Sequence, residues 1–274
     1  MSSSTTSRRS DWWIPISLVL LSLVPAIAGT ARLAQLVGGA EVTAANARFF
    51  AQPIPVVLHI LVVIPYSLVG AFQFSPGFRR RNRPWHRAAG RVLGVFGLVV
   101  ALTGLWMAHF YPWPEGDGLG VYVERLAFGT AMAASIVLGI DAVRRRDFKA
   151  HGAWMTRAYA IGLGAGTQVL THLPWVILVG KPGEAARTVL MGAGWVINIV
   201  VAEWIIRRGQ KGIAAHQSAV RGQYALVRLF VGFGVARQHD RAGRCVSVPH
   251  PAAELVRGDH AFDVDRVPVV RNAE

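Results

Sequence analysis

The stretch RRRNRPWHRAAGRVLGVFGLVVALTG, residues 79–104, decides the fold of this chain. It joins a dense cluster of arginines and one histidine to a long apolar run that carries glycine at regular intervals. A positive cluster at the end of an apolar run is typical of the cytoplasmic end of a transmembrane helix. The stretch therefore predicts a membrane protein, and its arginines predict how the chain is threaded.

The composition of the whole chain agrees with this interpretation. Of 274 residues, 53% are hydrophobic and only 16% are charged, whereas soluble proteins average about 25% charged residues. The net charge of +14 could indicate nucleic-acid binding, but many of the basic residues flank apolar runs. We therefore expect the lipid bilayer as the partner, and no nucleic acid. The single cysteine, Cys245, excludes a disulfide framework and a thiolate metal site.

Six apolar runs are each close to the ~20 residues that cross the hydrocarbon core as a helix. They cover about residues 12–31, 53–74, 88–110, 123–143, 152–179 and 188–206. The sequence thus predicts an all-α, six-helix integral membrane bundle. Residues 1–11 and the polar tail 209–274 are expected to be disordered, with a small interfacial helix as the alternative for the tail. The first run could be a cleaved signal peptide, but its length favours a retained helix.

The loops predict the orientation. Arginines and lysines gather after the second, fourth and sixth runs, whereas the loops after the third and fifth runs are acidic or nearly neutral. By the positive-inside rule both termini are cytoplasmic. We expect a multi-pass protein of the bacterial inner membrane.

Histidines inside the runs are the first candidates for a site, because polar groups at membrane depth are costly and often functional. His59 and His172 are expected about 9 and 12 Å below the outer surface, whereas His86 and His151 lie in the first turns of helices that enter from the cytoplasm. All four fall on stripes that we expect to face the bundle interior. Two inward histidines at one depth can hold a haem iron from both sides. His59 with His172 is thus the outer candidate for haem b, and His86 with His151 the inner one.

Simpler explanations exist for these residues. A histidine beside arginines is often a headgroup-level residue or a helix cap, and a buried histidine often bonds to another helix. Tyr66 and Gln73 share the stripe of His59, and Gln168 shares that of His172. Arg157 could reach the inner interface or pair with Glu203 or Asp141, and a structural ion pair is favoured over a proton relay.

Two segments resemble a known family. His86-Arg87-Ala-Ala-Gly90-Arg91 opens one predicted helix, and His151-Gly-Ala-Trp154-Met155-Thr-Arg157 opens another. Together with Gln73-Phe74 before the basic loop, they resemble the signature segments of the predicted membrane proteins called "domain of unknown function 2306", over about residues 50–208. The resemblance implies a multi-helix membrane protein and no particular activity.

The sequence contains no soluble-enzyme motif such as Gly-x-Ser-x-Gly, His-Glu-x-x-His or a phosphate loop, so it leaves open whether the protein is an enzyme. The leading functional hypothesis is a haem b protein for electron transfer or redox sensing. The alternatives are a small-molecule or proton-coupled transporter, with Arg157, Gln168 and Glu203 along its path, and a membrane assembly partner without chemistry.

Overall fold

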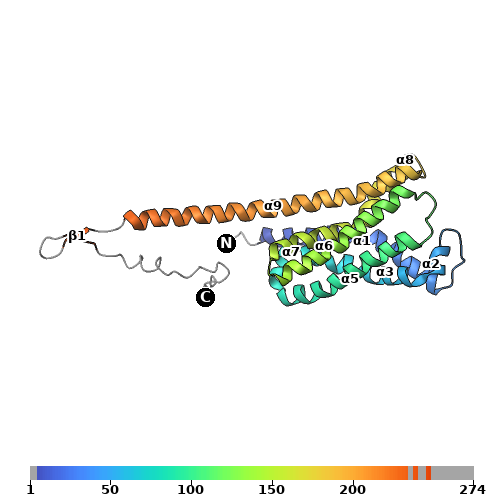
Figure 1. Cartoon of the computed structure of the whole chain (residues 1–274), viewed down its shortest axis with the longest axis horizontal. Coiled ribbons are helices and arrows are strands. Elements are labelled where there is room, and N and C mark those ends of the chain that lie inside the picture. Colours follow the sequence, from blue (N-terminus) through green and yellow to red (C-terminus); the bar gives the residue numbers. More distant parts are fainter. Residues whose placement is uncertain (1–4, 234–236, 240–244, 248–274) are drawn as a thin grey trace. The chain divides into compact units, whose positions relative to one another are not determined.

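The computed structural model of the chain describes residues 5–233, 237–239 and 245–247, and the side chains of residues 12–210. The described chain is helical apart from two three-residue strands (Figure 1). Its elements are α1 (Thr5–Val37), α2 (Ala47–Ala51), α3 (Pro53–Gly70), the 3-10 helix η1 (Ala71–Phe74), α4 (Pro76–Arg81), α5 (Arg83–Phe110), α6 (Leu119–Arg144), α7 (Phe148–Gly162), α8 (Gly164–Leu178), α9 (Glu184–Phe233), β1 (Arg237–His239) and β2 (Cys245–Ser247). The chain divides into two units, residues 1–208 and 209–274.

Candidate spans lie at all six predicted positions, as five single helices and one bent pair. Five stretches are long and apolar enough to cross a membrane: Trp12–Val37, Pro53–Phe74, Arg83–Phe110, Leu119–Arg144 and Glu184–Gln210. The pair α7–α8 becomes the sixth if it counts as one span. The all-α membrane fold predicted from the sequence is therefore confirmed.

Two helices extend into segments for which we expected disorder. Helix α1 begins at Thr5, and α9 continues to Phe233. In the second unit, β1 and β2 pair antiparallel with Arg237 opposite Ser247. The expectation of disorder for residues 1–4, 234–236, 240–244 and 248–274 lies outside the described residues.

The fifth span is not the single helix predicted over 152–179. It bends by 43° between Gly162 and Gly164, where Leu163 ends α7 and caps α8. The break does not coincide with Pro174, which lies inside α8. Glycines let the chain come close to its neighbours here: a β-carbon on Gly164 would lie 2.2 Å from the Trp195 indole nitrogen, and one on Gly166 would lie 2.2 Å from the Leu21 carbonyl oxygen.

The core lies where α3, α5, α6 and α7 meet. Its buried members include Tyr66, Val100, Ile136 and Ala158. The glycine stripe of α5 takes part in this packing, since a β-carbon at Gly97 would lie 2.8 Å from both Ile136 and Tyr66. Large apolar side chains elsewhere on the helices are exposed, as expected for a surface that faces lipid.

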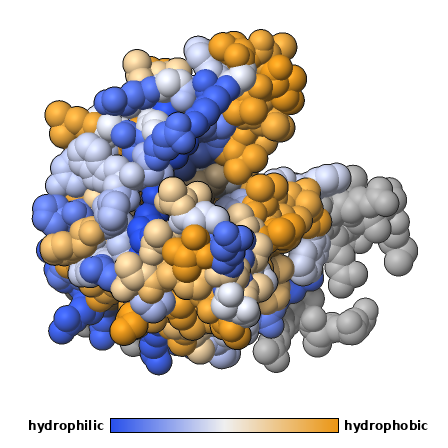
Figure 2. Space-filling model, turned by 90° about the vertical axis from the view of Figure 1, so that its right-hand side faces the viewer, coloured by the Kyte–Doolittle hydropathy of each residue, from blue (hydrophilic) through white to orange (hydrophobic). Residues whose placement is uncertain are grey.

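The two ends of the bundle differ in charge. One end, called here the arginine end, carries Arg79–Arg81 of α4, the start of α5 and the end of α6 at Arg144. Helix α1 starts there, with Trp12 against Phe72 and Phe78. The other end, called the α2 end, carries α2 and the loops 111–118 and 179–183. Figure 2 looks onto the α2 end and shows hydrophilic and apolar side chains side by side around a hollow.

Candidate functional site

A cavity of about 480 Å³ lies inside the bundle toward the α2 end. All six spans and α2 contribute to its wall, including Ala26 and Gly29 of α1, Ile60 and Ile64 of α3, Gly104 and Leu105 of α5, Phe128 and Met132 of α6, and Met191 and Trp195 of α9. The wall is largely apolar. Its size and lining are those of a small-molecule site, which usually combines an apolar wall with a few placed polar groups.

The break in the fifth span forms part of this wall. Ile161, Gly162, Leu163, Ala165 and Gly166 all line the cavity. In membrane proteins, broken helices are tolerated where they line a cavity or are covered by protein. The bend therefore lies at the cavity wall, where a broken helix is tolerated.

His59 presents its ring to the cavity in a fixed state. The Thr103 hydroxyl lies 2.5 Å from the Val99 carbonyl oxygen, to which it donates, and 2.9 Å from His59 Nδ1. Because the hydroxyl proton is used toward Val99, the Thr103 oxygen accepts from His59 Nδ1–H. The neutral ring then keeps its lone pair on Nε2, and His59 can offer the cavity a hydrogen-bond acceptor or a metal ligand.

Four other neutral polar side chains of the wall, those of Gln168, Ser22, Ser67 and Tyr111, are bonded to protein. Gln168 Nε2 donates to the Met191 carbonyl at 3.3 Å, and the hydroxyls of Ser22 and Ser67 donate to carbonyls one turn earlier in their own helices. Gln168, predicted from the sequence as a site residue, does line the cavity. These bonds leave His59 as the neutral polar side chain of the wall best placed for a ligand.

An arginine cluster lies at the α2 end of the cavity. Arg48 of α2 and Arg125 of α6 line the wall. Asp117, whose side chain is only 1% exposed, pairs with Arg125 at 2.6 Å and with Arg187 of α9. Burial, and next the charge of Arg125, lower the pKa of Arg48. The site thus has a cationic mouth above an apolar interior.

His172 does not share the cavity with His59. Its Nδ1–H donates to the Gln168 carbonyl at 2.8 Å, and its buried Nε2 has no hydrogen-bond partner among the described residues. His172 is not among the residues of the cavity wall. Of the four predicted histidines, only His59 lines the cavity.

The inner pair lies at the arginine end. His151 Nδ1–H donates to the Gly139 carbonyl at 2.8 Å, which joins α7 to α6. His86 lies close enough to Arg79 and His151 to interact with both electrostatically. The buried atoms His86 Nδ1 and Gln73 Nε2 have no partner within the described chain. The two signature segments therefore meet at one end of the bundle, away from the cavity.

Tyr66 belongs to the core. Its ring is buried against Tyr159, with ring centroids 5.7 Å apart, and the Tyr159 hydroxyl donates to the Ser67 carbonyl at 2.5 Å. The expected stripe of His59, Tyr66 and Gln73 thus runs from the cavity through the core to the arginine end. Shared periodicity placed these residues on one face of the span, but each has different neighbours.

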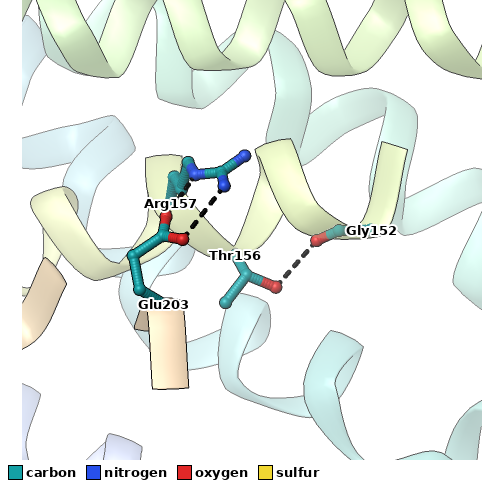
Figure 3. Close-up of polar contacts among 4 residues, drawn as sticks. All are labelled: Gly152, Thr156, Arg157 and Glu203. Atoms are coloured by element: carbon teal, nitrogen blue, oxygen red, sulfur yellow. Dashed lines mark hydrogen bonds and ion pairs between the residues drawn. The ribbon is translucent and has the colours of Figure 1, made fainter. Parts of the chain in front are cut away.

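Arg157 forms an ion pair with Glu203, which is one of the two acidic partners that the sequence offered for it. Arg157 Nε and Nη2 lie 2.5 and 3.2 Å from the two carboxylate oxygens of Glu203 (Figure 3). The guanidinium also covers the Trp154 ring at 4.6 Å. Asp141 pairs instead with Arg145, the C-terminal cap of its own helix. The Arg157–Glu203 pair joins α7 to α9 and does not line the cavity.

The sequence predictions missed the arginine cluster. Arg48, Asp117, Arg125 and Arg187 come from four separate segments, and none was singled out. One signal was present, because Arg125 stands inside an apolar run, where an ionisable residue suggests a functional site. Thr103 was missed because a single threonine in an apolar helix belongs to no recognisable sequence motif.

One family of known proteins matches most of this membrane unit. The family described as "Predicted membrane protein (DUF2306)" matches residues 56–206. This range includes the break, His59 and most of the cavity wall, but it excludes α1 and α2. No curated protein and no solved structure matches the chain.

Proposed function

The chain belongs to the DUF2306 family of predicted membrane proteins, and from its cavity we propose that it binds a lipophilic small molecule within the membrane, as a carrier or receptor. The observation that carries this proposal is the apolar cavity of about 480 Å³ with His59 on its wall. An apolar body fits the wall, and a hydrogen-bond donor on the ligand fits His59 Nε2. Of the alternatives raised by the sequence, this one corresponds to the small-molecule transporter.

A cavity-filling variant tests the proposal. At Gly104 an added β-carbon would meet only the His59 ring, at an ordinary 3.6 Å, so Gly104→Leu places its side chain in the cavity without a backbone clash. Gly90→Leu is the matched control on the same helix, because Gly90 is exposed, its added β-carbon would meet only Gln73 Oε1 at an ordinary 3.9 Å, and it lies outside the cavity wall. Native mass spectrometry of the purified full chain, combined with analysis of extracted lipophiles, provides the readout.

We expect the wild type and Gly90→Leu to retain a bound lipophile and Gly104→Leu to lose at least about nine-tenths of it, since tenfold corresponds to only 1.4 kcal/mol. Equal retention by all three proteins would overturn the proposal. So would the absence of any bound lipophile from the wild type, both as purified and after incubation with membrane lipid extract.

Haem b between His59 and His172 is the second candidate. It is favoured by the bonds at the two Nδ1 atoms, because a metal-ligating histidine usually donates its other ring N–H to an oxygen acceptor. Both Nε2 atoms would then be available for the iron. The position of His172 outside the cavity wall places this candidate second.

The absorption spectrum of the purified protein tests the haem proposal. The protein purified from cells supplied with a haem precursor should show a Soret band that His59→Ala or His172→Ala abolishes. His109→Ala is the matched control, because the exposed His109 side chain is hydrogen-bonded to the Tyr122 hydroxyl outside the cavity. A colourless preparation would overturn haem binding.

We further propose that the protein resides in the inner membrane of a bacterial cell, with the arginine end and both termini in the cytoplasm. The positive-inside rule supports this orientation, since Arg79–Arg81, Arg83 and Arg144–Arg146 all belong to the arginine end. The cavity would then open toward the outer leaflet.

A further inference from the structure

We propose that the ligand of the cavity is an amphiphile with one oxyanion headgroup, whose headgroup Arg48 and Arg125 bind while its apolar chain fills the cavity. This inference rests on the proposed function and adds the chemical class of the ligand. It is carried by the arrangement of charges at the α2 end, which the binding of a neutral lipophile would leave unexplained.

The first observation is an excess of positive charge. Arg125, Arg32 and Arg187 act on Arg48 together with one carboxylate, Asp117, and a second carboxylate, Glu124, acts on Arg125, so that four arginines face two carboxylates. Asp117 already forms ion pairs with Arg125 and Arg187. Like charges held close together at low dielectric repel one another, so an added anion would be stabilised here.

The second observation concerns the hydrogen-bond donors of the Arg48 guanidinium, which are not used in an ion pair with a described acidic side chain. The guanidinium contacts the Phe49 ring at 4.6 Å. Arg32 covers the same ring at 4.5 Å and donates to Gln35. Arginine can bind a carboxylate or phosphate through two parallel hydrogen bonds, and Arg48 lines the cavity mouth with these donors available.

The third observation is the position of the charges relative to the apolar wall. Arg48 and Arg125 line the same cavity as Ile60, Leu105 and Phe128. A free inorganic anion would satisfy the arginines and leave the apolar wall empty, whereas a neutral lipophile would do the reverse. An acyl chain with a terminal carboxylate or phosphate matches both parts.

The test compares ligands that share one chain and differ in headgroup. Dissociation constants of the purified full chain are measured by native mass spectrometry for dodecanoate, dodecyl phosphate, dodecan-1-ol and inorganic phosphate. We expect an anionic dodecyl ligand to bind at least about tenfold more tightly than the alcohol, as a hydrogen-bonded charge contributes about 1.5–3 kcal/mol. Dodecanoate as the tightest ligand would identify a fatty-acid headgroup, and dodecyl phosphate a phospholipid headgroup.

Arg48→Gln should reduce this preference for the anion to less than about threefold. Lys181→Gln is the matched control: it removes one positive charge at the same end of the bundle, but Lys181 is exposed, pairs with Glu115 and lies outside the wall. The preference should survive in Lys181→Gln. If Arg48→Gln does not fold, the salt dependence of the wild type takes its place, since the preference should fall as sodium chloride screens the charges.

The outcomes separate the two proposals. Equal binding of the anions and the alcohol would overturn the anionic headgroup and leave the lipophile site intact. Binding of inorganic phosphate as tight as that of dodecyl phosphate would overturn the amphiphile. Failure of every dodecyl ligand to bind would overturn the proposed function itself.

Discussion

At the residue scale, the hydroxyl of Thr103 fixes what His59 can do. It donates along its own helix to Val99 and accepts from His59 Nδ1–H, so it acts as a bridge that determines the tautomer of the ring. A histidine with its lone pair on Nε2 is ready to accept a hydrogen bond or bind a metal. Both the lipophile and the haem proposals depend on this single state of His59.

The Arg157–Glu203 pair is the residue-scale contact whose contribution to stability can be measured most directly. The two side chains are 26% and 30% exposed, between an exposed pair, worth about 0.2–1 kcal/mol, and a fully buried one, whose loss costs about 3–5 kcal/mol. A double-mutant cycle with Arg157→Met and Glu203→Gln should give a coupling energy of about 1–2 kcal/mol. Reversible unfolding in mixed detergent and SDS micelles measures it.

The pair of Asp141 and Arg145 supplies the control for this cycle, because its side chains are 51% and 70% exposed. Its coupling should not exceed about 0.5 kcal/mol. Equal coupling in both cycles would show that position within the bundle adds nothing to the Arg157–Glu203 pair.

Individual contacts were the part of the structure that the sequence predicted least. It offered Glu203 and Asp141 as partners of Arg157; in the structure Arg157 pairs with Glu203, whereas Asp141 pairs with Arg145, the C-terminal cap of α6. It predicted that His59 and His172 lie at one depth, because the number of residues between a histidine and the end of its span gives its depth. It could not tell that only His59 reaches the cavity, because that depends on where α8 points after the bend.

At the element scale, the break in the fifth span has the greatest consequence. The apolar run 152–179 carries no proline or polar residue near 163, so its composition predicts one continuous helix. The glycines at 162, 164 and 166 were visible, but glycine is common inside transmembrane helices as a packing residue. What distinguishes them is the close approach of other helices, α3 at Gly162, α9 at Gly164 and α1 at Gly166, which the sequence of this span does not predict.

Gly166→Ala tests how far the bend depends on this close approach. The new methyl group would lie 2.2 Å from the Leu21 carbonyl oxygen, and because that atom belongs to a backbone, α1 and α8 would have to separate. We expect a loss of about 1–3 kcal/mol of unfolding free energy, as for other overpacked sites, together with weaker ligand binding by the cavity. Unfolding in mixed micelles measures the first effect.

Gly152→Ala is the matched control in the same span, since nothing lies within 4 Å of its β-carbon. Alanine is the better helix former by about 1 kcal/mol, so this variant should be neutral or more stable. Equal stability of Gly166→Ala and the wild type would show that α1 and α8 are not in close contact.

At the scale of the whole molecule, hydrophobic length and charge were enough to predict the fold. The bilayer imposes one length on every span, so the positions of the spans follow from composition, whereas the helix ends and the break in the fifth span do not. No comparable rule of length or composition predicts the cavity. It is a property of all six spans together, and the residues of its cationic mouth are far apart along the chain.

The orientation of the molecule gives the last prediction. A reporter that is active only in the cytoplasm should be active when fused after Arg146 or Lys211, and inactive when fused after Gly183 in the loop between α8 and α9. The arginines at 144–146 and 207–208 flank the spans on the side that we assign to the cytoplasm, where positive loops are retained during insertion. The fusion after Gly183 is the internal control, because it differs from the Lys211 fusion by the last span alone. Activity after Gly183 without activity after Lys211 would invert the bundle and place the cationic mouth in the cytoplasm, where its amphiphile would come from the inner leaflet.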